Sequence, residues 1–283
     1  MKKMNYNQCL KQTLFVAYKA GLGLRKKAKN LKDLRINIKE AQGLVSKADI
    51  ESENLIRKLL LDYYPDHEFL GEEGSYKSFG SSRKILKKFG DIPWCWVVDP
   101  LDGTTNYLNQ FDYYAVCIGL LHYGRPTLGV VYRPETGECF FATEGKGAWK
   151  GVLDSKGITR KKRLTSYKKN NLKDCLLVTG FSSEKGKVFN SEFKKFNKML
   201  TKCRGVRRLG SAALDMCYVA EGTFDGFWEA GLAPWDVTAA SLICLESKLN
   251  VTNYKGEEFN PFDKSILTAS KKVHLQMKDV LLD

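Results

Sequence analysis

The sequence predicts a mixed α/β protein of the α+β kind, and two stretches with different patterns support this prediction. From Tyr113 onward, three apolar runs separated by turns that contain glycine or proline indicate an antiparallel β-meander. From Cys175 onward, strand-like and helix-like runs alternate, which indicates a mixed layer packed against the first sheet. A chain of 283 residues can bury a substantial core. We therefore expect two domains, 1–160 and 161–283, with their boundary in the basic run 160–163.

Two helices are expected before the first sheet. Residues 5–28 have apolar positions at helical spacing, which predicts a helix with one buried face: Leu10, Leu14, Ala17 and Gly21. The polar stretch 29–42 is expected to be a mobile loop. Residues 46–49 match the S-x-x-D pattern of a helix start, and a second helix should continue over 50–63. In this pattern Asp49 is an ordinary acid of the first helical turn.

The remaining elements follow from short apolar runs and the turn residues between them. In the first half we expect strands over 94–98, 114–121, 127–132 and 138–142, a closing pair near 148–149 and 164, and an exposed connection over 75–92. In the second half we expect strands over 175–179, 206–209, 224–229, 249–254 and 266–269. The helices between them are expected over 190–201, 212–220 and 237–247.

The stretch 99–106, with the sequence DPLDGTTN, is the strongest indication of chemistry. It follows the apolar run 94–98, so its two aspartates come at the end of a buried strand. Pro100 should end further sheet pairing, and Gly103 permits a tight turn. Carboxylates crowded on such a bend suit a hard divalent cation, and backbone amides just past a glycine suit a phosphate. An ordinary aspartate-rich turn remains an equal alternative on these eight residues alone.

Two further groups of acids have the same two interpretations. Glu72 and Glu73 lie between glycines after a short apolar strand, either as solvated loop residues or as metal ligands. Asp236 follows Pro234 and Trp235 at the first position of a helix, where the helix dipole favours an acid in any case. Local sequence does not decide between these interpretations.

Composition narrows the class of protein. A formal charge of +14 permits binding of nucleic acid or another anion, but the basic residues are spread along the chain, so we favour a surface that aids solubility.

Eight cysteines without a C-x-x-C pair, and only three histidines, argue against zinc and fit a reducing cytosol. Cysteines in apolar runs should be small buried hydrophobes: Cys95, Cys117 and Cys244. Lys19 interrupts the apolar run 13–24, and no apolar stretch reaches about 18 residues, so we expect no signal peptide, no membrane span and a cytoplasmic protein.

Three motifs, in their order and spacing, closely resemble the signatures of the inositol monophosphatase family. They are Glu72-Glu73, the stretch 99–106, and 235–240 with the sequence WDVTAA. The stretch 207–215, RRLGSAALD, resembles the bacterial inositol-1-monophosphatase branch. The likeness runs from about residue 44 to 269 and places the chain in a superfamily of lithium-sensitive, magnesium-dependent phosphatases. It implies a layered αβαβα sandwich of the inositol monophosphatase and fructose-1,6-bisphosphatase type.

The resemblance also implies roles at the metal site. The carboxylates that resemble the family's metal ligands are Glu72, Asp99, Asp102 and Asp236, with the backbone carbonyl of Leu101 as a further oxygen. Glu73 resembles a residue that supports these ligands or binds a third ion. Thr104 and Asp49 resemble the pair that orients the attacking water, with Glu72 assisting. In this comparison Asp49 is more than a helix cap.

The substrate contacts are implied in the same way. The amides of Gly103 and Thr104 would hold the phosphate. The positions that resemble contacts to the rest of the substrate are Asp102, Gly210, Ser211, Ala212, Glu229 and Asp236, with Arg208 as a further contact. A carboxylate such as that of Glu229 can accept hydrogen bonds from vicinal hydroxyl groups. The implied partner is therefore a small phosphorylated polyol.

The implied reaction is hydrolysis of inositol-1-phosphate, with two or three Mg²⁺ ions and with Mn²⁺ as a substitute. Carboxylates alone would repel a phosphate dianion, whereas the cations reverse the local field and acidify the attacking water. No covalent intermediate is needed. Uncatalysed hydrolysis of a phosphate monoester is very slow, and electrostatic stabilisation of the transition state is the main means of accelerating it.

Three alternatives remain open. The same chemistry could act on fructose 1,6-bisphosphate, histidinol phosphate or 3′-phosphoadenosine 5′-phosphate. Some bacterial relatives act in transcription or RNA handling, so nucleic acid or the transcription machinery is another candidate partner. A metal-binding scaffold without turnover is the third, and the complete set of acids argues against it. The resemblance also implies a homodimer.

The chain departs from the family pattern in two turns. Residues 246–249, ESKL, stand where relatives usually have Glu-Ala-Gly-Gly, and 265–270 lack a Gly-Asn pair. Both stretches lie far in the sequence from the expected ligands, so they bear on loop shape rather than on catalysis. The loop 29–42 is too divergent to align.

Overall fold

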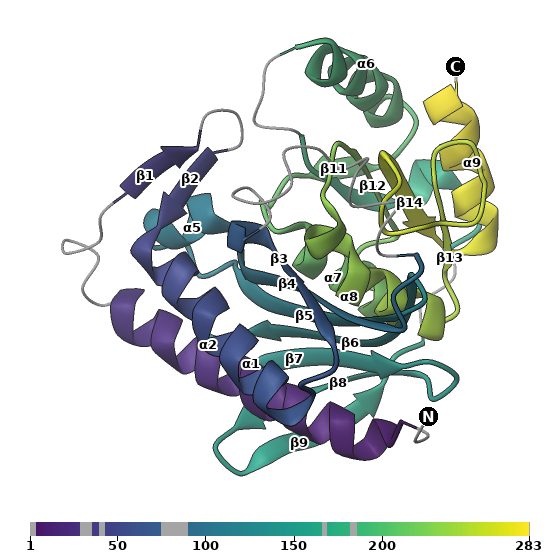
Figure 1. The fold of residues 1–283 in the computed structure, drawn as a ribbon. Coiled ribbons are helices and arrows are strands. Elements are labelled where there is room, and N and C mark those ends of the chain that lie inside the picture. The colour runs from purple at the N-terminus through teal and green to yellow at the C-terminus, as the bar shows by residue number, and fades with distance from the viewer. Residues whose placement is uncertain are drawn as a thin grey trace.

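The computed structural model describes residues 4–28, 36–39, 43–74, 90–165, 169–181 and 186–282. Across these residues, two β-sheets alternate with three layers of helices (Figure 1). The order through the molecule is helices, larger sheet, helices, smaller sheet, helices, which is a layered αβαβα sandwich. The fold class expected from the sequence is therefore confirmed.

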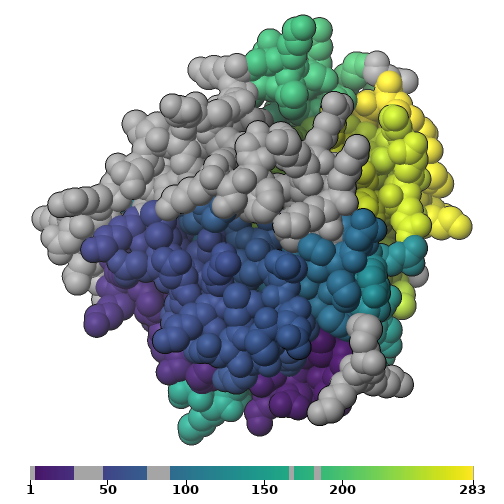
Figure 2. Space-filling view, in the orientation of Figure 1, coloured from purple at the N-terminus to yellow at the C-terminus, as the bar shows by residue number. Residues whose placement is uncertain are grey.

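The first helical layer consists of α1 (Tyr6–Ala28) and α2 (Lys47–Tyr63), which pack together on one face of the larger sheet. In the space-filling view, the two helices form a continuous surface across the lower part of this face (Figure 2). Of the residues expected on the buried face of α1, Leu14, Ala17 and Gly21 are buried and Leu10 is half-buried. The buried residues of α1 are Cys9, Thr13, Leu14, Val16, Ala17, Ala20, Gly21 and Leu24. Before α2, β1 (Ile36–Lys39) pairs with β2 (Gly43–Ser46).

The larger sheet has seven strands among the described residues, arranged in chain order. They are β3 (Glu68–Gly71), β4 (Trp94–Asp102), β5 (Ala115–His122), β6 (Arg125–Arg133), β7 (Glu138–Thr143), β8 (Ala148–Asp154) and β9 (Gly157–Arg163). All neighbours are antiparallel except β3 and β4, which are parallel. The antiparallel meander is confirmed. Because β3 and β4 are parallel, the residues that follow them emerge at the same edge of the sheet.

Pro100 does not end the pairing of β4, contrary to the expectation from sequence. Asp99 pairs with Cys117, the register then shifts, and pairing resumes where Asp102 meets Ala115. Proline lacks the N–H that a ladder needs, so it is tolerated here because the ladder is irregular at this point. The irregularity keeps both aspartates attached to the sheet while the backbone between them bends.

The middle layer consists of α7 (Ala212–Glu221) and α8 (Pro234–Glu246). Helix α8 lies directly on β4, β5 and β6, and two glycines in those strands make room for it. A Cβ added at Gly119 would come within 2.5 Å of the Thr238 side chain, and one added at Gly129 would collide with the backbone of Ala239. The close approach fixes the height of α8, and therefore of the acid at its start, above the sheet.

Gly129→Ala is expected to lower the free energy of unfolding by about 1–3 kcal/mol, the usual cost of overpacking. The added methyl group would collide with backbone atoms of α8, which cannot rotate away as a side chain can. Gly23→Ala is the matched control, because an added Cβ on Gly23 meets no atom within 4 Å and alanine favours a helix. Urea unfolding should show the control unchanged or stabilised. Equal midpoints for the two variants would contradict the close approach of α8.

The smaller sheet and its outer helices complete the sandwich. Its described strands are β10 (Leu176–Thr179), β11 (Gly205–Arg207), β12 (Gly226–Ala230), β13 (Asn250–Thr252) and β14 (Ser265–Ala269), in the order β11-β10-β12-β14-β13. Strand β10 is parallel to β11 and β12, and β14 is antiparallel to its two neighbours. Helices α6 (Lys187–Leu200) and α9 (Lys271–Leu282) cover the outer face, together with the short helix η2 (Leu172–Asp174).

Several expectations need correction. Helix α9 was not expected from the sequence, although Val273, Met277 and Leu281 recur every four residues and are buried. The stretch 29–42 was expected to be a loop throughout, but its residues 36–39 form β1 because they pair with β2. The expected exposed connection over 75–92 lies largely outside the described residues. Residue 160, the expected domain boundary, lies within β9, and the division into two domains stays a prediction.

Two expectations from composition can be compared with the structure. All eight cysteines fall within the described ranges as free thiols, and all except Cys203 are buried. In the part of the chain that the structure describes, no helix is both long enough and apolar enough to cross a lipid bilayer.

Candidate active site

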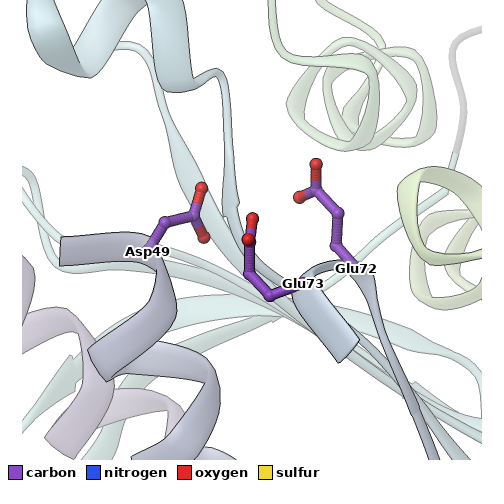
Figure 3. A group of neighbouring side chains, drawn as sticks. All are labelled: Asp49, Glu72 and Glu73. Carbon is purple, nitrogen blue, oxygen red and sulfur yellow. The ribbon is translucent and has the colours of Figure 1, made fainter. Parts of the chain in front are cut away.

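Three carboxylates from two elements meet at the edge of the larger sheet (Figure 3). Asp49 lies in the first turn of α2, while Glu72 and Glu73 lie in the helical turn that follows β3. One carboxylate oxygen from each residue lies within 4.8 Å of the other two. Asp49 and Glu73 are buried, and Glu72 is half-buried. Carboxylates held this close under partial burial repel one another unless a cation or a proton compensates them, so the cluster fits a hard divalent cation.

Glu53 holds the turn that follows β3. Its Oε2 accepts a hydrogen bond from the N–H of Glu73 at 2.7 Å, and its Oε1 accepts one from the N–H of Gly74 at 2.9 Å. A Cβ added at Gly71 would collide with the same carboxylate. Glu53 is buried on α2 one turn after Asp49, so one face of α2 supplies a cluster carboxylate and the support for the others. Glu53 was not expected from the sequence, and its four-residue spacing from Asp49 is the signal that could have indicated it.

Glu53→Gln is expected to weaken the affinity for Mg²⁺ or Mn²⁺ by about 10–100-fold, as loss of a group that supports metal ligands usually does. The glutamine amide would present a donor to a backbone N–H that now has an acceptor, so the turn should move. Isothermal titration of the metal-free protein with MnCl₂ measures the change. Glu51→Gln, an exposed acid on the same helix, is the control. Equal affinities for the two variants would show that Glu53 does not position the turn.

The bend after β4 brings a second group of oxygens to the same edge. Gly71 at the end of β3 pairs with Val98, so the next residue of each strand, Glu72 and Asp99, comes out side by side. The Asp99 Oδ1 accepts a hydrogen bond from the N–H of Leu101 at 2.9 Å. The hydroxyl of Thr104 donates to the carbonyl of Leu101 at 3.1 Å, and it lies 3.5 Å from the Asp49 Oδ2. Thr104 and Asp49 are thus neighbours, although 55 residues separate them.

The turn at Gly103 needs glycine. Its φ is +96°, and a Cβ there would lie 3.0 Å from the Tyr113 carbonyl oxygen and 3.3 Å from that of Gly210. The short helix α5 (Thr104–Leu108) begins directly after it. Within α5, the Asn106 amide donates to the carbonyl of Tyr113 at 2.7 Å and to that of Leu209 at 2.8 Å. Asn106 therefore connects the bend of the larger sheet to the segment that precedes α7, a role that was not expected from the sequence.

The start of α7 holds Asp102. The Ser211 hydroxyl donates to the Asp102 Oδ2 at 2.5 Å, and the N–H of Ala213 donates to the same oxygen at 2.9 Å. Ser211 is also the N-cap of α7, where its hydroxyl accepts a hydrogen bond from the N–H of Leu214 at 3.4 Å. Gly210 precedes it with φ +90°. Ser211 thus caps the helix that was expected over 212–220, and its hydroxyl also fixes a candidate metal ligand.

Asp236 arrives at the site on α8. The expectation that it occupies the first helical position is wrong, because α8 begins at Pro234 and Asp236 is its third residue. From there its Oδ2 accepts a hydrogen bond from the N–H of Ala233 at 2.7 Å, which closes the helix start. The Asp236 carboxylate also lies near Asp99, because its charge is one of those that raise the pKa of Asp99. Its cap role and its place beside the other acids are therefore compatible.

Burial and mutual repulsion raise the pKa values of these acids. The pKa of Asp99 lies well above its ordinary value, first because the carboxyl is buried and then because other carboxylates surround it. Those neighbours are Glu72, Asp102, Asp236 and Asp49. Burial, followed by the charges of Asp102 and Glu72, raises the pKa of Asp236 as well. Burial raises the pKa of Asp102 to about 6, against the opposing effect of its hydrogen bonds from α7. A divalent cation would offset this repulsion, and a donor set made only of oxygens suits Mg²⁺ or Mn²⁺.

The other side of the site belongs to the smaller sheet. Glu229 on β12 is buried, and burial followed by the charges of Asp215, Asp236 and Asp102 raises its pKa, while Arg208 opposes the shift. Arg208 is exposed, and its guanidinium lies 5.6 Å from the centre of the Phe181 ring. The structure thus places Glu229 within electrostatic reach of the candidate metal ligands. The roles assigned to the site residues from the family resemblance stay predictions.

Comparisons with known proteins show what the chain is related to. Residues 6–280 match the Inositol monophosphatase family. A putative Nus factor SuhB from Neisseria meningitidis serogroup B is 34% identical over 275 residues, which cover 97% of this chain and 98% of the relative. An inositol-1-monophosphatase from Caulobacter vibrioides is 34% identical over 268 residues, 94% of this chain and 97% of the relative. The crystal structure of the extragenic suppressor protein suhB from Bartonella henselae superimposes with a TM-score of 0.82 at 29% identity, over 95% of this chain and 96% of that one.

The two-sheet sandwich and the acidic edge define the class of protein, a metal-dependent phosphatase of the layered αβαβα type. The chain belongs to the inositol monophosphatase family. The resemblance drawn from the three sequence motifs is therefore confirmed, and the acidic cluster agrees with a metal-dependent family.

Proposed function

We propose that this protein hydrolyses inositol-1-phosphate to inositol and phosphate, with Mg²⁺ as its cofactor. The observation that carries the proposal is the convergence of carboxylates from α2, β4, α8 and the turn after β3, with Thr104 beside Asp49. Family membership supports the reaction class, phosphomonoester hydrolysis. The resemblance of 207–215 to inositol-1-monophosphatases and the name of the Caulobacter relative support the substrate.

The metal ligands in this proposal are the residues that resemble the family's ligands. They are Glu72, Asp99, Asp102, Asp236 and the carbonyl of Leu101, with Glu73 supporting them or binding a third ion. Bound Mg²⁺ would neutralise the phosphate dianion and make a water more acidic. Glu53 holds the turn that contains Glu72 and Glu73, and Ser211 holds the Asp102 carboxylate, through the hydrogen bonds described above.

Asp49 and Thr104 orient the attacking water in the proposed mechanism, and Glu72 assists. The hydroxyl of Thr104 donates toward the Leu101 carbonyl or Asp49, so its lone pair is available to a water. Asp49 is buried beside it and can take the proton that the water loses. The amides of Gly103 and Thr104 hold the phosphate next to this pair.

The inositol ring binds on the side of the smaller sheet. Glu229 accepts hydrogen bonds from vicinal hydroxyl groups, and Arg208 offers donors at the rim of the site. The start of α7, with Gly210, Ser211 and Ala212, forms the wall between the ring and Asp102. A ring rich in hydroxyl groups suits this side because Glu229 offers an acceptor and Arg208, whose charge acts on Glu229, offers donors.

A substrate panel tests the proposal. Purified protein would be assayed on inositol-1-phosphate, fructose 1,6-bisphosphate, histidinol phosphate and 3′-phosphoadenosine 5′-phosphate, with Mg²⁺, with Mn²⁺ and with EDTA. We expect the highest kcat/KM for inositol-1-phosphate, loss in EDTA, and recovery with either cation. A higher value for another ester would reassign the substrate. Absence of cation-dependent turnover on all four esters would overturn the proposal.

A second candidate function is binding of RNA in transcription. The Neisseria relative is named a putative Nus factor, and this chain carries a formal charge of +14. Strand β9 forms one edge of the larger sheet, and its residues 159–163 (TRKKR) are exposed. Fluorescence anisotropy with single-stranded RNA at 50–200 mM KCl tests this function. Salt-dependent binding that weakens in Lys161→Gln/Lys162→Gln would support it. Unchanged anisotropy would mean that these lysines do not bind RNA and only keep the edge strand β9 from pairing with other chains.

We also propose, from the family resemblance, that the protein is a cytoplasmic homodimer. Sedimentation equilibrium would measure the mass in solution, and a monomer at micromolar concentration would contradict the dimer. Cell fractionation would test the location.

A further inference from the structure

Tyr113 connects the Gly103 turn to the helix that holds Asp102. Its main chain lies against the turn, because its carbonyl oxygen accepts a hydrogen bond from Asn106 and would be 3.0 Å from a Cβ on Gly103. Its side chain crosses to α7, where the Oη donates to the Asp215 Oδ1 at 2.8 Å. Tyr113 is 6% exposed and Asp215 is 1% exposed, so water does not compete for this hydrogen bond.

Asp215 lies one turn into α7, close to the residues that orient Asp102. The N–H of Asp215 donates to the Ser211 carbonyl at 2.9 Å, within the turn whose Ser211 hydroxyl and Ala213 N–H both bind the Asp102 Oδ2. The first turn of α7 is therefore held by Asp102 on one side and by Tyr113 on the other. The stretch 207–215 includes Asp215, and the family resemblance assigned it no role.

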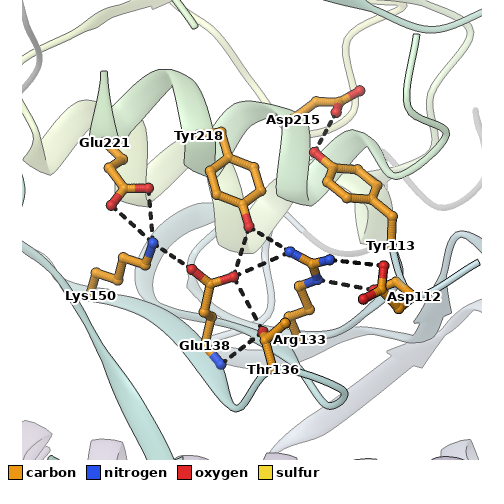
Figure 4. A network of polar contacts seen from close by, with 9 residues as sticks. All are labelled: Asp112, Tyr113, Arg133, Thr136, Glu138, Lys150, Asp215, Tyr218 and Glu221. Carbon is orange, nitrogen blue, oxygen red and sulfur yellow. Dashed lines mark hydrogen bonds and ion pairs between the residues drawn. The ribbon is translucent and has the colours of Figure 1, made fainter. Parts of the chain in front are cut away.

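Tyr218 and Arg133 both pack against the ring of Tyr113 (Figure 4). The Tyr218 ring, one turn further along α7, stacks on it with centres 6.0 Å apart and planes 21° apart. The Arg133 guanidinium lies 5.4 Å from the ring centre. Arg133 is itself held by the carbonyl of Asp112 at 3.0 Å and the carboxylate of Asp112 at 3.1 Å.

The group around the ring continues into the larger sheet. Glu138 on β7 accepts hydrogen bonds from Arg133 at 3.3 Å and from the Tyr218 hydroxyl at 2.8 Å. Lys150 on β8 then bridges Glu138 at 2.5 Å and Glu221 at 2.9 Å. Charged groups in a partly buried network of this kind have little freedom, so Tyr113 is aimed at Asp215 by several elements at once.

We propose that Tyr113 is a positioning residue for the active site and acts through Asp215. The Tyr113–Asp215 hydrogen bond sets the distance between the Gly103 turn and the first turn of α7, and so fixes the Asp102 carboxylate against Asp99. The inference deepens the proposed function and rests on it for the identity of Asp102 as a metal ligand. It assigns a role to two residues that are neither proposed metal ligands nor proposed substrate contacts.

Tyr113→Phe tests the inference because it removes only the hydroxyl oxygen. The matched control is Tyr114→Phe, which changes the adjacent buried tyrosine. The Tyr114 hydroxyl donates to the Glu135 Oε1 at 2.7 Å and not to a residue of α7. Asp215→Ala removes the acceptor, and Asp215→Asn keeps an acceptor oxygen without the charge. The readouts are kcat and KM for inositol-1-phosphate, Mn²⁺ affinity of the metal-free protein by isothermal titration, and the urea midpoint.

We expect Tyr113→Phe and Asp215→Ala each to weaken Mn²⁺ affinity and lower kcat by about tenfold, the usual effect of losing support for a metal ligand. KM should change by less than about twofold, since neither residue touches the substrate. The double variant Tyr113→Phe/Asp215→Ala should lose no more than either single variant, because both remove the same hydrogen bond. Asp215→Asn should recover most of the loss. The urea midpoint of Tyr113→Phe should fall no further than that of Tyr114→Phe.

Three results would overturn the inference. The first is Mn²⁺ affinity and kcat in Tyr113→Phe equal to those of Tyr114→Phe. The second is a loss in Asp215→Asn as large as in Asp215→Ala, which would assign the effect to charge rather than to position. The third is additive losses in the double variant. If the wild-type protein hydrolyses none of the esters, the proposed function fails, while the Mn²⁺ affinities still decide whether Tyr113 positions the acidic site.

Discussion

Asp99→Asn is expected to lower cation-dependent turnover by about 10³-fold or more, because groups that only support metal ligands already account for about 10–100-fold. The amide has the same size and still offers an oxygen to the N–H of Leu101, so the bend after β4 should persist. It carries no charge, however, and is a weak ligand for a hard cation. Without metal, the variant should be more stable than the wild type at neutral pH, since it removes one of several buried carboxylates that repel one another.

The opposite directions of these two effects separate a ligand from a structural residue. If Asp99 were only structural, its substitution would lower both the activity and the stability of the protein. If it is a metal ligand, its substitution lowers the activity and raises the stability measured in EDTA. Initial rates with Mg²⁺ and urea midpoints in EDTA measure the two quantities. Asp62→Asn, an exposed aspartate on α2, is the control and should change neither. Turnover near the wild-type rate in Asp99→Asn would rule out its role as a ligand.

The second large effect concerns pH and Mg²⁺. Protonation of the buried aspartates should stabilise the metal-free protein at low pH. This contribution to the free energy of unfolding should be lost as the pH rises from about 4, near the ordinary aspartate pKa of about 3.9, through 6. Folding raises the pKa of Asp102 to about 6, and raises those of Asp99 and Asp236 as well. Each raised pKa means that the folded state binds the proton more tightly, so the contribution is complete below the ordinary pKa and disappears above the folded one.

The size of this contribution is measurable. A pKa difference of one corresponds to about 1.4 kcal/mol, so Asp102 alone accounts for on the order of 3 kcal/mol. Mg²⁺ binds the deprotonated carboxylates, so it should stabilise the protein more at pH 8 than at pH 5. Urea midpoints across this range, with Mg²⁺ or with EDTA, give the difference directly. KCl at equal ionic strength is the control. An equal gain from Mg²⁺ at both pH values would show that these acids do not bind the cation.

The local elements could be predicted from sequence to a large extent. The helical spacing of apolar residues in 5–28 and the alternating runs after Tyr113 depend on neighbours in the chain, so they are visible without the fold. Helix α9 was missed although its spacing is regular, which was a failure of interpretation. Strand β1 was missed although Ile36 and Ile38 alternate with polar residues, which is the spacing of a strand.

The candidate site could be predicted only in part. Asp99 and Asp102 stand out because turn residues and acids are adjacent in the chain. Local sequence favoured Asp49 as a helix cap, yet it is buried beside Thr104, which is 55 residues away. The four-residue spacing from Asp49 places Glu53 on the same helix face, but residue types alone do not show that its carboxylate binds the backbone N–H groups of Glu73 and Gly74.

The sequence by itself determined the order of elements, the bend at Gly103 and the family, because each depends on residue types at short or regular spacing. The tertiary structure decided which acids meet. The parallel register of β3 and β4 brings Glu72 beside Asp99, and the close approach of α8 to Gly119 and Gly129 carries Asp236 to the same edge. These distances arise from packing between layers, and packing joins residues whose separation along the chain carries no information about their separation in space.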